Sequence, residues 1–353
     1  MAARLRLWGS IVSWNIVGHE WAVEQLRRSI LAGSDAHAYI FSGPPGLGKA
    51  ALALHMAQAL NCERGPGDPC QECRACRRIT RGSHPDVRIA GMASQGAALK
   101  ADEAARQKEL KIATVREWQH DISLRPYEGR RRVLILHDAE RLNEESSNAM
   151  LKTLEEPPDY ATIILVANST DLLPTIVSRC RVLRLRPLPR RQVAEALVAR
   201  NIIAADAELL AAWSGGRVGW ALAAVAQPET ITARQEQLTA LVELGGHSYS
   251  RGAAFRWAEQ RAKEYRGGEQ EVVFAWLDLW QGWWRDVLLV AVGCHESVVN
   301  IDRRHELAHA AARHHIPAIH AFVGRIGTAA QQLRENGNPQ LVLENMLLHM
   351  PAA

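Results

Sequence analysis

The loop GPPGLGK at residues 43–49 constrains the fold of this chain more than any other stretch. The apolar run AYIFSG leads into the loop, and the helix-forming run ALALHMAQAL follows it. In such a loop the glycines let successive backbone N–H groups converge on phosphates at a helix N-terminus, while the lysine neutralises the β and γ charges. The order strand, loop, helix therefore predicts an α/β domain built around a phosphate-binding loop.

The loop supplies seven candidate nucleotide-binding residues, and the residue that follows them is unusual for such a loop. A Ser or Thr at that position normally holds the Mg²⁺ of a bound nucleotide, but this chain has Ala50. We therefore expect ATP to be bound weakly or not at all, with its metal poorly positioned. The candidates are Gly43, Pro44, Pro45, Gly46, Leu47, Gly48 and Lys49.

Three further β-branched runs indicate a parallel sheet. They are PDVRIAG from Pro85, RRVLILHDAE from Arg131 and ATIILVAN from Ala161, and helical stretches separate them. Residues 93–108 are Ala-rich and polar without an apolar stripe, which predicts a surface insertion. The first half of the chain is therefore expected to be α/β.

Asp138 follows the hydrophobic run VLILH, where the second metal-organising acid of such a fold would lie. An alternative is that Asp138 is only a surface acid beyond a core strand. The next residue is Ala139, where hydrolysing proteins of this kind carry a Glu that orients the attacking water. Glu140 is displaced by one residue and is expected to point elsewhere.

Four cysteines form the pattern C-x7-C-x2-C-x2-C within residues 62–76. Four thiolates with two tight C-x2-C steps suit a tetrahedral structural Zn²⁺ that has no open position for catalysis. Free or redox-active thiols are the alternative, but the surrounding loop has no apolar core of its own to keep it folded. The expected ligands are Cys62, Cys70, Cys73 and Cys76.

The length of 353 residues favours two or three domains, and the net charge of +4 permits nucleic-acid contact without requiring it. The run from Val272 to Gly293 is the best candidate for a membrane span, but three charged residues interrupt it, so a buried helix of a bundle is expected. The N-terminal sequence does not resemble a signal peptide, which predicts a cytoplasmic protein. The three charged residues are Asp278, Arg285 and Asp286.

The sequence HELAH, His305 to His309, formally matches the zinc-binding pattern H-E-x-x-H. The motif is short, lies in a region rich in His and Ala, and lacks a defined third ligand. Histidines on a solvated helix face are therefore the preferred interpretation.

Several stretches together resemble the clamp-loader branch of the AAA+ ATPases. They are HAYIFSGPPGLGK, the four-cysteine insertion, HPD at His84 to Asp86, DAERLNEESSNAMLKTLEEPP, SRC at Ser178 to Cys180, and NGNPQLVLENMLL near the C-terminus. The resemblance implies a RecA-like AAA+ module over residues 1–186 with an inserted zinc site. It further implies a small helical lid over 187–228 and an all-α collar domain over 229–353.

Motor subunits of this family (γ and τ) carry Ser or Thr after the loop lysine and Asp-Glu at the strand end. Ala50 and Ala139 depart from both features, so the resemblance implies a stator without ATPase activity of its own. Such a subunit would join the δ and γ/τ subunits in a five-membered ring that places a sliding clamp on primed DNA.

The arginine of the SRC motif maps onto Arg179, which the resemblance implies acts in trans on the γ-phosphate of a neighbouring subunit. Sensor positions of the family map onto Asn168 and Arg217. Two alternatives remain: an active ATPase in which Asp138 or Glu140 suffices, and a zinc-dependent interaction or DNA-binding module. The second alternative leaves LKTLEEPP and SRC unexplained.

Overall fold

The chain forms two compact units in a computed structural model that describes residues 14–96, 107, 109–169, 172–244 and 251–351. One unit comprises Met1–Gln192 with Gly216–Trp220, and the other comprises Val193–Gly215 with Ala221–Ala353. The residues expected to form a lid, 187–228, are thus divided between the two units. Each unit is described separately below.

A five-stranded parallel sheet organises the first unit, with the strand order β2-β3-β4-β1-β5. The expected α/β class is therefore confirmed, although β5 was not predicted. Residues of β1 alternate between two cores, because Tyr39 and Phe41 face one side of the sheet while Ala38 and Ile40 face the other. The strands are β1 Ala38–Ser42, β2 Val87–Ala90, β3 Arg132–Leu136, β4 Ala161–Ala167 and β5 Arg181–Arg184.

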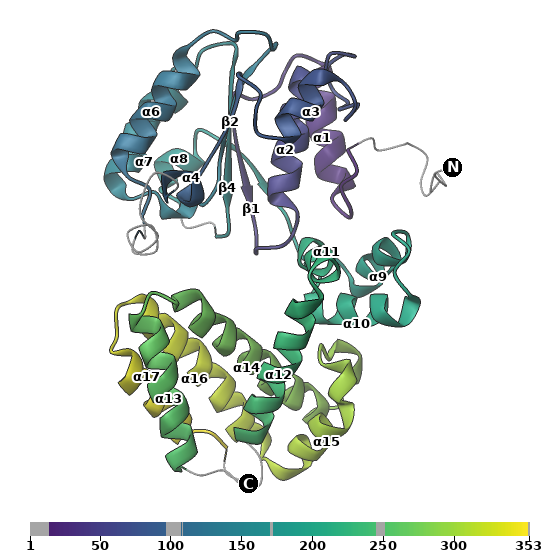
Figure 1. The fold of residues 1–353 in the computed structure, drawn as a ribbon, viewed down its shortest axis with the longest axis vertical. Helices are drawn as coiled ribbons and strands as arrows, with labels where there is room; N and C mark the ends of the chain where they lie inside the picture. The colour runs from purple at the N-terminus through teal and green to yellow at the C-terminus, as the bar shows by residue number, and fades with distance from the viewer. Residues whose placement is uncertain (1–13, 97–106, 108, 170–171, 245–250, 352–353) are drawn as a thin grey trace. The chain divides into compact units, whose positions relative to one another are not determined.

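Helices cover both faces of this sheet (Figure 1). On one side lie α1 Glu20–Leu31, α2 Lys49–Asn61 and α3 Arg74–Thr80, and on the other α6 Ile112–Ser123, α7 Glu144–Glu155 and α8 Pro174–Val177. A short 3₁₀ turn, η1 Ala139–Arg141, follows β3. Of the expected insertion at 93–108, α4 Met92–Gly96 covers the beginning, and most of the remainder lies outside the described residues.

The second unit is helical, as the family resemblance implied for the residues after 186. Within it, α14 Gln270–Ala291 buries four tryptophans against a core that includes Phe322. The helices from α9 onward are α9 Arg190–Val198, α10 Ala204–Ser214, α11 Val218–Ala226, α12 Pro228–Leu244, α13 Arg251–Arg266, α14, α15 Arg304–Arg313, α16 Ile316–Arg334 and α17 Pro339–Leu348, with 3₁₀ turns η2 His295–Ser297 and η3 Ile301–Arg303. The first residues of α9, to Gln192, and of α11, to Trp220, belong to the first unit.

The prediction for the run Val272 to Gly293 is confirmed by the burial of α14. Among the helices that the structure describes, none is both long enough and apolar enough to span a membrane.

Candidate functional site: the phosphate-type loop and its surroundings

The loop between β1 and α2 has the geometry of a phosphate-binding loop. Gly43, Gly46 and Gly48 have φ values of 140°, 81° and 92°, which side chains with a Cβ rarely adopt. Ala50 is exposed on the first turn of α2 and presents only a methyl group. The backbone can therefore form the expected loop, but it lacks the hydroxyl that would hold a metal ion.

The ammonium of Lys49 is engaged by the loop itself. Its Nζ donates hydrogen bonds to the carbonyl oxygens of Gly43 at 2.6 Å and Pro44 at 2.7 Å. Burial lowers the pKa of Lys49 to about 8, although the nearby negative charge of Glu140 acts in the opposite direction. A phosphate that bound here would have to draw the ammonium away from two short hydrogen bonds.

The acids after β3 are arranged differently from the prediction. Asp138 adopts a left-handed conformation, with φ 56°, and its Oδ2 accepts a hydrogen bond from the Met92 N–H at 3.3 Å. Glu140 does not point elsewhere, which corrects our expectation: it accepts hydrogen bonds from the backbone N–H and side-chain Nδ2 of Asn168, at 3.1 and 3.0 Å. Glu140, rather than Asp138, is the acid whose negative charge favours the protonated form of Lys49.

Arg217 lies beside the loop, where the family resemblance places a sensor. A Cβ atom added to Gly46 would lie 3.4 Å from the Cβ of Arg217 and 3.2 Å from the Cβ of Trp220. The N–H of Gly219 donates to the Gly46 carbonyl at 2.7 Å, which fixes the start of α11 against the loop. The Arg217 guanidinium lies 5.9 Å from the centre of the Trp220 ring.

Arg179 follows α8 and is held at the surface by an acid that the sequence interpretation overlooked. Its Nη2 lies 2.6 Å from Oε1 of Glu155, the last residue of α7, and its Nη1 donates to the Thr175 carbonyl at 2.9 Å. The side chain remains 35% exposed, so the guanidinium is oriented yet accessible. Glu155 belongs to the LKTLEEPP stretch, which therefore contacts SRC in the fold.

The four predicted cysteine ligands meet in one cluster. All four Sγ atoms lie within 4.8 Å of one another, and Cys70 Sγ is 4.0 Å from Cys76 Sγ. Tetrahedral Zn²⁺ with Zn–S bonds of about 2.3 Å requires S–S separations of about 3.8 Å, so the donor set fits. Among the described residues no other group of three or more His, Cys, Asp or Glu side chains lies close enough together to hold a metal ion, and the HELAH residues are not part of such a group.

Backbone N–H groups aim at the cysteine sulfurs. The N–H groups of Cys73 and Cys76 lie 3.3 Å from the sulfurs of Cys70 and Cys73. Burial opposes ionisation of Cys70, but the N–H groups of Cys73 and Glu72 outweigh it and hold its pKa at about 7. The thiolate is thus favoured at Cys70, whereas burial raises the pKa of Cys62 and Cys76, so these two thiols would lose their protons on binding the metal.

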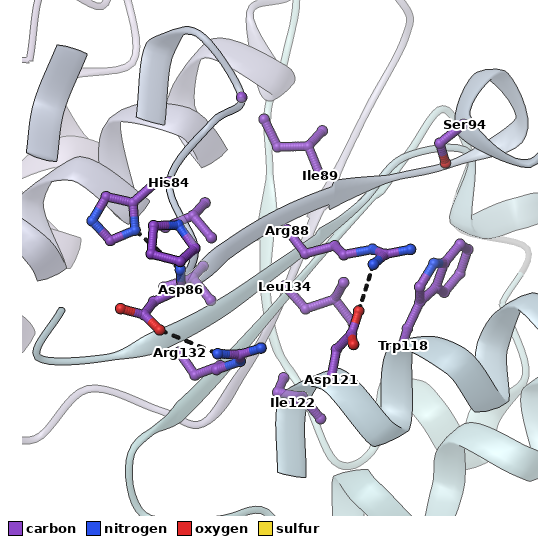
Figure 2. A pocket seen from close by; sticks show the side chains of 14 residues that line it. His84, Asp86, Arg88, Ile89, Ser94, Trp118, Asp121, Ile122, Arg132 and Leu134 are labelled. Atoms are coloured by element: carbon purple, nitrogen blue, oxygen red, sulfur yellow. Dashed lines mark hydrogen bonds and ion pairs between the residues drawn. The ribbon is translucent and has the colours of Figure 1, made fainter. Parts of the chain in front are cut away.

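A hollow of about 430 Å³ lies beside β2 and contains the HPD residues (Figure 2). The Asp86 carboxylate accepts hydrogen bonds from the N–H groups of Tyr127, Glu128 and Gly129, at 2.7, 2.9 and 2.7 Å, and from Arg132 Nη1 at 3.1 Å. The Asp86 N–H donates to Nδ1 of His84 at 3.1 Å. The HPD motif therefore anchors the loop before β3, a role that its sequence alone did not indicate.

Comparisons with known proteins agree with the earlier resemblance. A family model described as DNA polymerase III, delta subunit, matches residues 18–189, and one described as DNA polymerase III, delta subunit, C terminal, matches residues 228–351. DNA polymerase III subunit tau of Bacillus subtilis is 35% identical over 198 residues, covering 56% of this chain and 32% of the relative.

Two relatives bear the name DNA polymerase III subunit delta'. The protein of Pseudomonas aeruginosa is 37% identical over 186 residues, covering 51% of this chain and 53% of the relative. The protein of Bacillus subtilis is 31% identical over 177 residues, covering 50% of each chain. The matches thus span about a third of the length of the tau relative and about half of each delta' relative.

Among solved structures, a DNA polymerase III gamma subunit-related protein from Thermotoga maritima aligns with a TM-score of 0.45 and 19% identity, covering 93% of this chain and 98% of that chain. The family models carry the assignment, because both describe one subunit and between them match the sheet-containing and the helical parts of the sequence. The chain belongs to the DNA polymerase III delta-subunit family.

Proposed function

We propose that this chain is the delta-prime (δ′) subunit of a DNA polymerase III clamp loader, acting as a stator beside a motor subunit. In this role it assembles with δ and γ/τ subunits in a five-membered ring, which places the sliding clamp on primed DNA. The observation that carries the proposal is a phosphate-type loop without a metal-holding hydroxyl, whose lysine is bonded to its own backbone. ATP is therefore weak or absent in this subunit.

Arg179 completes the proposed role. Glu155 holds its guanidinium at the surface, where it can reach the γ-phosphate of a nucleotide on the neighbouring subunit. An arginine supplied in trans stabilises the negative charge of phosphoryl transfer and is worth about 10³ to 10⁵ in rate at the site that it serves. The four cysteines support a structural Zn²⁺ that closes the loop of residues 62–76.

A reconstituted complex tests the role of Arg179. With Arg179→Ala as its only change, we expect the ring to assemble while ATP hydrolysis stimulated by clamp and primed DNA falls without disappearing, because other motor sites receive their arginines elsewhere. Arg179→Lys should restore little, since a point charge does not reproduce the planar fork. The matched control is Arg28→Ala, which removes a surface arginine paired with Glu24. Unchanged hydrolysis in the Arg179 variants would refute the proposal.

A second candidate is an active γ/τ-like ATPase, and the contacts of Glu140 favour it. Glu140 accepts hydrogen bonds from Asn168, and its negative charge favours the protonated form of Lys49. An acid is therefore present where it could orient a water molecule. The isolated chain separates the candidates. A stator shows no ATP turnover above background, whereas turnover lost in both Lys49→Ala and Glu140→Gln would establish the ATPase and overturn the stator proposal.

A further inference from the structure

We propose that the first unit carries a binding surface for single-stranded nucleic acid on its cysteine-anchored helix and the loop that precedes β3. We call it the α3–loop surface and define it by six exposed residues. They are Arg74, Arg77, Arg81, Arg125, Tyr127 and Arg130. It is distinct from the phosphate-type loop and does not depend on ATP chemistry.

The helix α3 and its C-cap residue contribute three of the arginines along one face. Arg74, Arg77 and Arg81 are spaced by three and four residues, which places them on one side of a helix, and all three are exposed. The opposite side buries Ala75, Cys76 and Ile79. Among the described residues none of the three arginines forms an ion pair.

The loop contributes an exposed aromatic ring between two further arginines without ion pairs. Tyr127 is 84% exposed, the highest fraction among the exposed large hydrophobic side chains of the described residues. Its backbone is nevertheless fixed, because its N–H and those of the next two residues donate to the buried Asp86 carboxylate. The ring is thus presented to solvent from an ordered loop that also carries Arg125 and Arg130.

Ion pairs join the two segments and leave their charge unbalanced. Arg78 of α3 pairs with Glu128 of the loop and donates to the Ser83 carbonyl at 2.9 Å. Asp121 is paired with Arg88 and Asp86 with Arg132 (Figure 2). Most of the neighbouring acids are therefore paired with other arginines, and none of the five arginines of the α3–loop surface forms an ion pair among the described residues; Glu63, which accepts from the Ala75 N–H, is the exception among the acids.

None of the six residues lines the hollow in Figure 2, but the lining is close to them in sequence. The lining includes Gly82, which follows Arg81, and Ile122, which lies shortly before Arg125. Guanidinium groups bind phosphate oxygens with two parallel hydrogen bonds, and an exposed tyrosine offers a face on which an unpaired base can stack. Duplex DNA keeps its base faces covered, so the exposed ring favours a single strand.

Fluorescence anisotropy with the full chain and a labelled oligothymidylate of about 20 nucleotides tests the proposal. Two double variants, Arg77→Ala/Arg81→Ala and Arg125→Ala/Arg130→Ala, should each weaken binding about tenfold or more at low salt. Each should also reduce the slope of log K against log salt concentration by up to about 1.4, because single-strand contacts contribute about 0.7 each. Arg251→Ala/Arg256→Ala removes the same charge from α13 and should leave binding unchanged.

Tyr127→Ala separates stacking from charge. Loss of one stacked base should weaken oligothymidylate binding about fivefold or more, while the salt slope stays the same. The Arg125, Arg130 and Tyr127 variants lie outside the cysteine segment, so they test the surface even where a change on α3 disturbs the fold.

Three results would overturn the proposal. Equal loss in the α13 control would show that only net charge matters, and unchanged binding in the double variants would remove the α3–loop surface altogether. Equally tight binding of a duplex of the same length, together with no effect of Tyr127→Ala, would identify a surface for duplex backbone instead of a single strand.

Discussion

Replacing Asp86 with alanine is expected to destabilise the first unit by about 3–5 kcal/mol. The side chain is fully buried and accepts hydrogen bonds from three backbone N–H groups and from Arg132. Each buried donor that loses its partner costs about 1–3 kcal/mol, and breaking a buried ion pair by removing one partner costs about 3–5 kcal/mol. Because water can reach part of the loop and hydrate the released N–H groups, we expect the loss to be that of the broken ion pair alone, about 3–5 kcal/mol.

Amide hydrogen exchange measured by mass spectrometry on peptides of β3 and β4 reports the stability of the first unit by itself. Asp86→Ala should accelerate exchange of these strands by about 10² to 10⁴. Asp121→Ala is the matched control, because its carboxylate also pairs with an arginine but is 25% exposed, and surface pairs contribute about 0–1 kcal/mol. Equal effects of the two substitutions would refute the reasoning.

The same carboxylate predicts an acid transition. Burial opposes the ionisation of Asp86, but the three backbone N–H groups, with help from His84, outweigh it and lower its pKa. A carboxyl whose pKa is lower in the folded state stabilises the fold above its unfolded pKa of about 3.9, and this stability is lost as pH falls through the folded pKa. Asp86→Asn should therefore lower stability at pH 7 and flatten its decline below about pH 4.

Three further predictions concern other parts of the molecule. Protein purified without chelators should contain one Zn²⁺ per chain by elemental analysis, and Cys73→Ser should lower the metal content and accelerate amide exchange in residues 62–76. Burial raises the pKa of Asp286, and its Oδ1 has no hydrogen-bond partner among the described residues. Asp286→Asn should therefore leave the free energy of unfolding unchanged or raise it, as measured by urea unfolding at pH 7. A loss of stability as large as that of Asp86→Ala would contradict this. In Gly219→Ala the new Cβ would lie 2.8 Å from the Gly46 carbonyl oxygen, so a lower melting temperature is expected, whereas Gly324→Ala on α16 meets nothing within 4 Å and should be neutral or stabilising.

Four of the five strands, β1 to β4, were predictable from their own sequences, whereas β5 was not. Apolar runs identified β1, β3 and β4 because each is buried along most of its length, and PDVRIAG identified β2, although only its two end residues are buried. The sequence of β5, Arg181–Arg184, is RVLR, and only Leu183 is buried. It becomes a strand by pairing with β1, which is a tertiary effect that a sequence window does not contain.

The candidate site was predictable where spacing determines geometry. The cysteines met as expected because two C-x2-C steps confine their sulfurs. Arg217 lies beside the loop, and its role as a sensor stays a prediction. The prediction for Glu140 was wrong because Asp138 adopts a left-handed conformation, which starts a 3₁₀ turn and redirects the following acid. The Lys49 contacts with its own loop carbonyls also depend on the folded backbone, and no residue type indicates them.

The strand order also determines when the sheet can form during synthesis. Ala38 pairs with Ile163, and among the described strands β1 neighbours only β4 and β5, so β1, which is buried along its whole length, remains unpaired until β4 leaves the ribosome. At about 5–20 residues per second this delay is on the order of ten seconds. We expect nascent chains that end before β4 to show an unprotected, chaperone-accessible β1, and protection to appear only once residues 161–167 are exposed to solvent outside the ribosome.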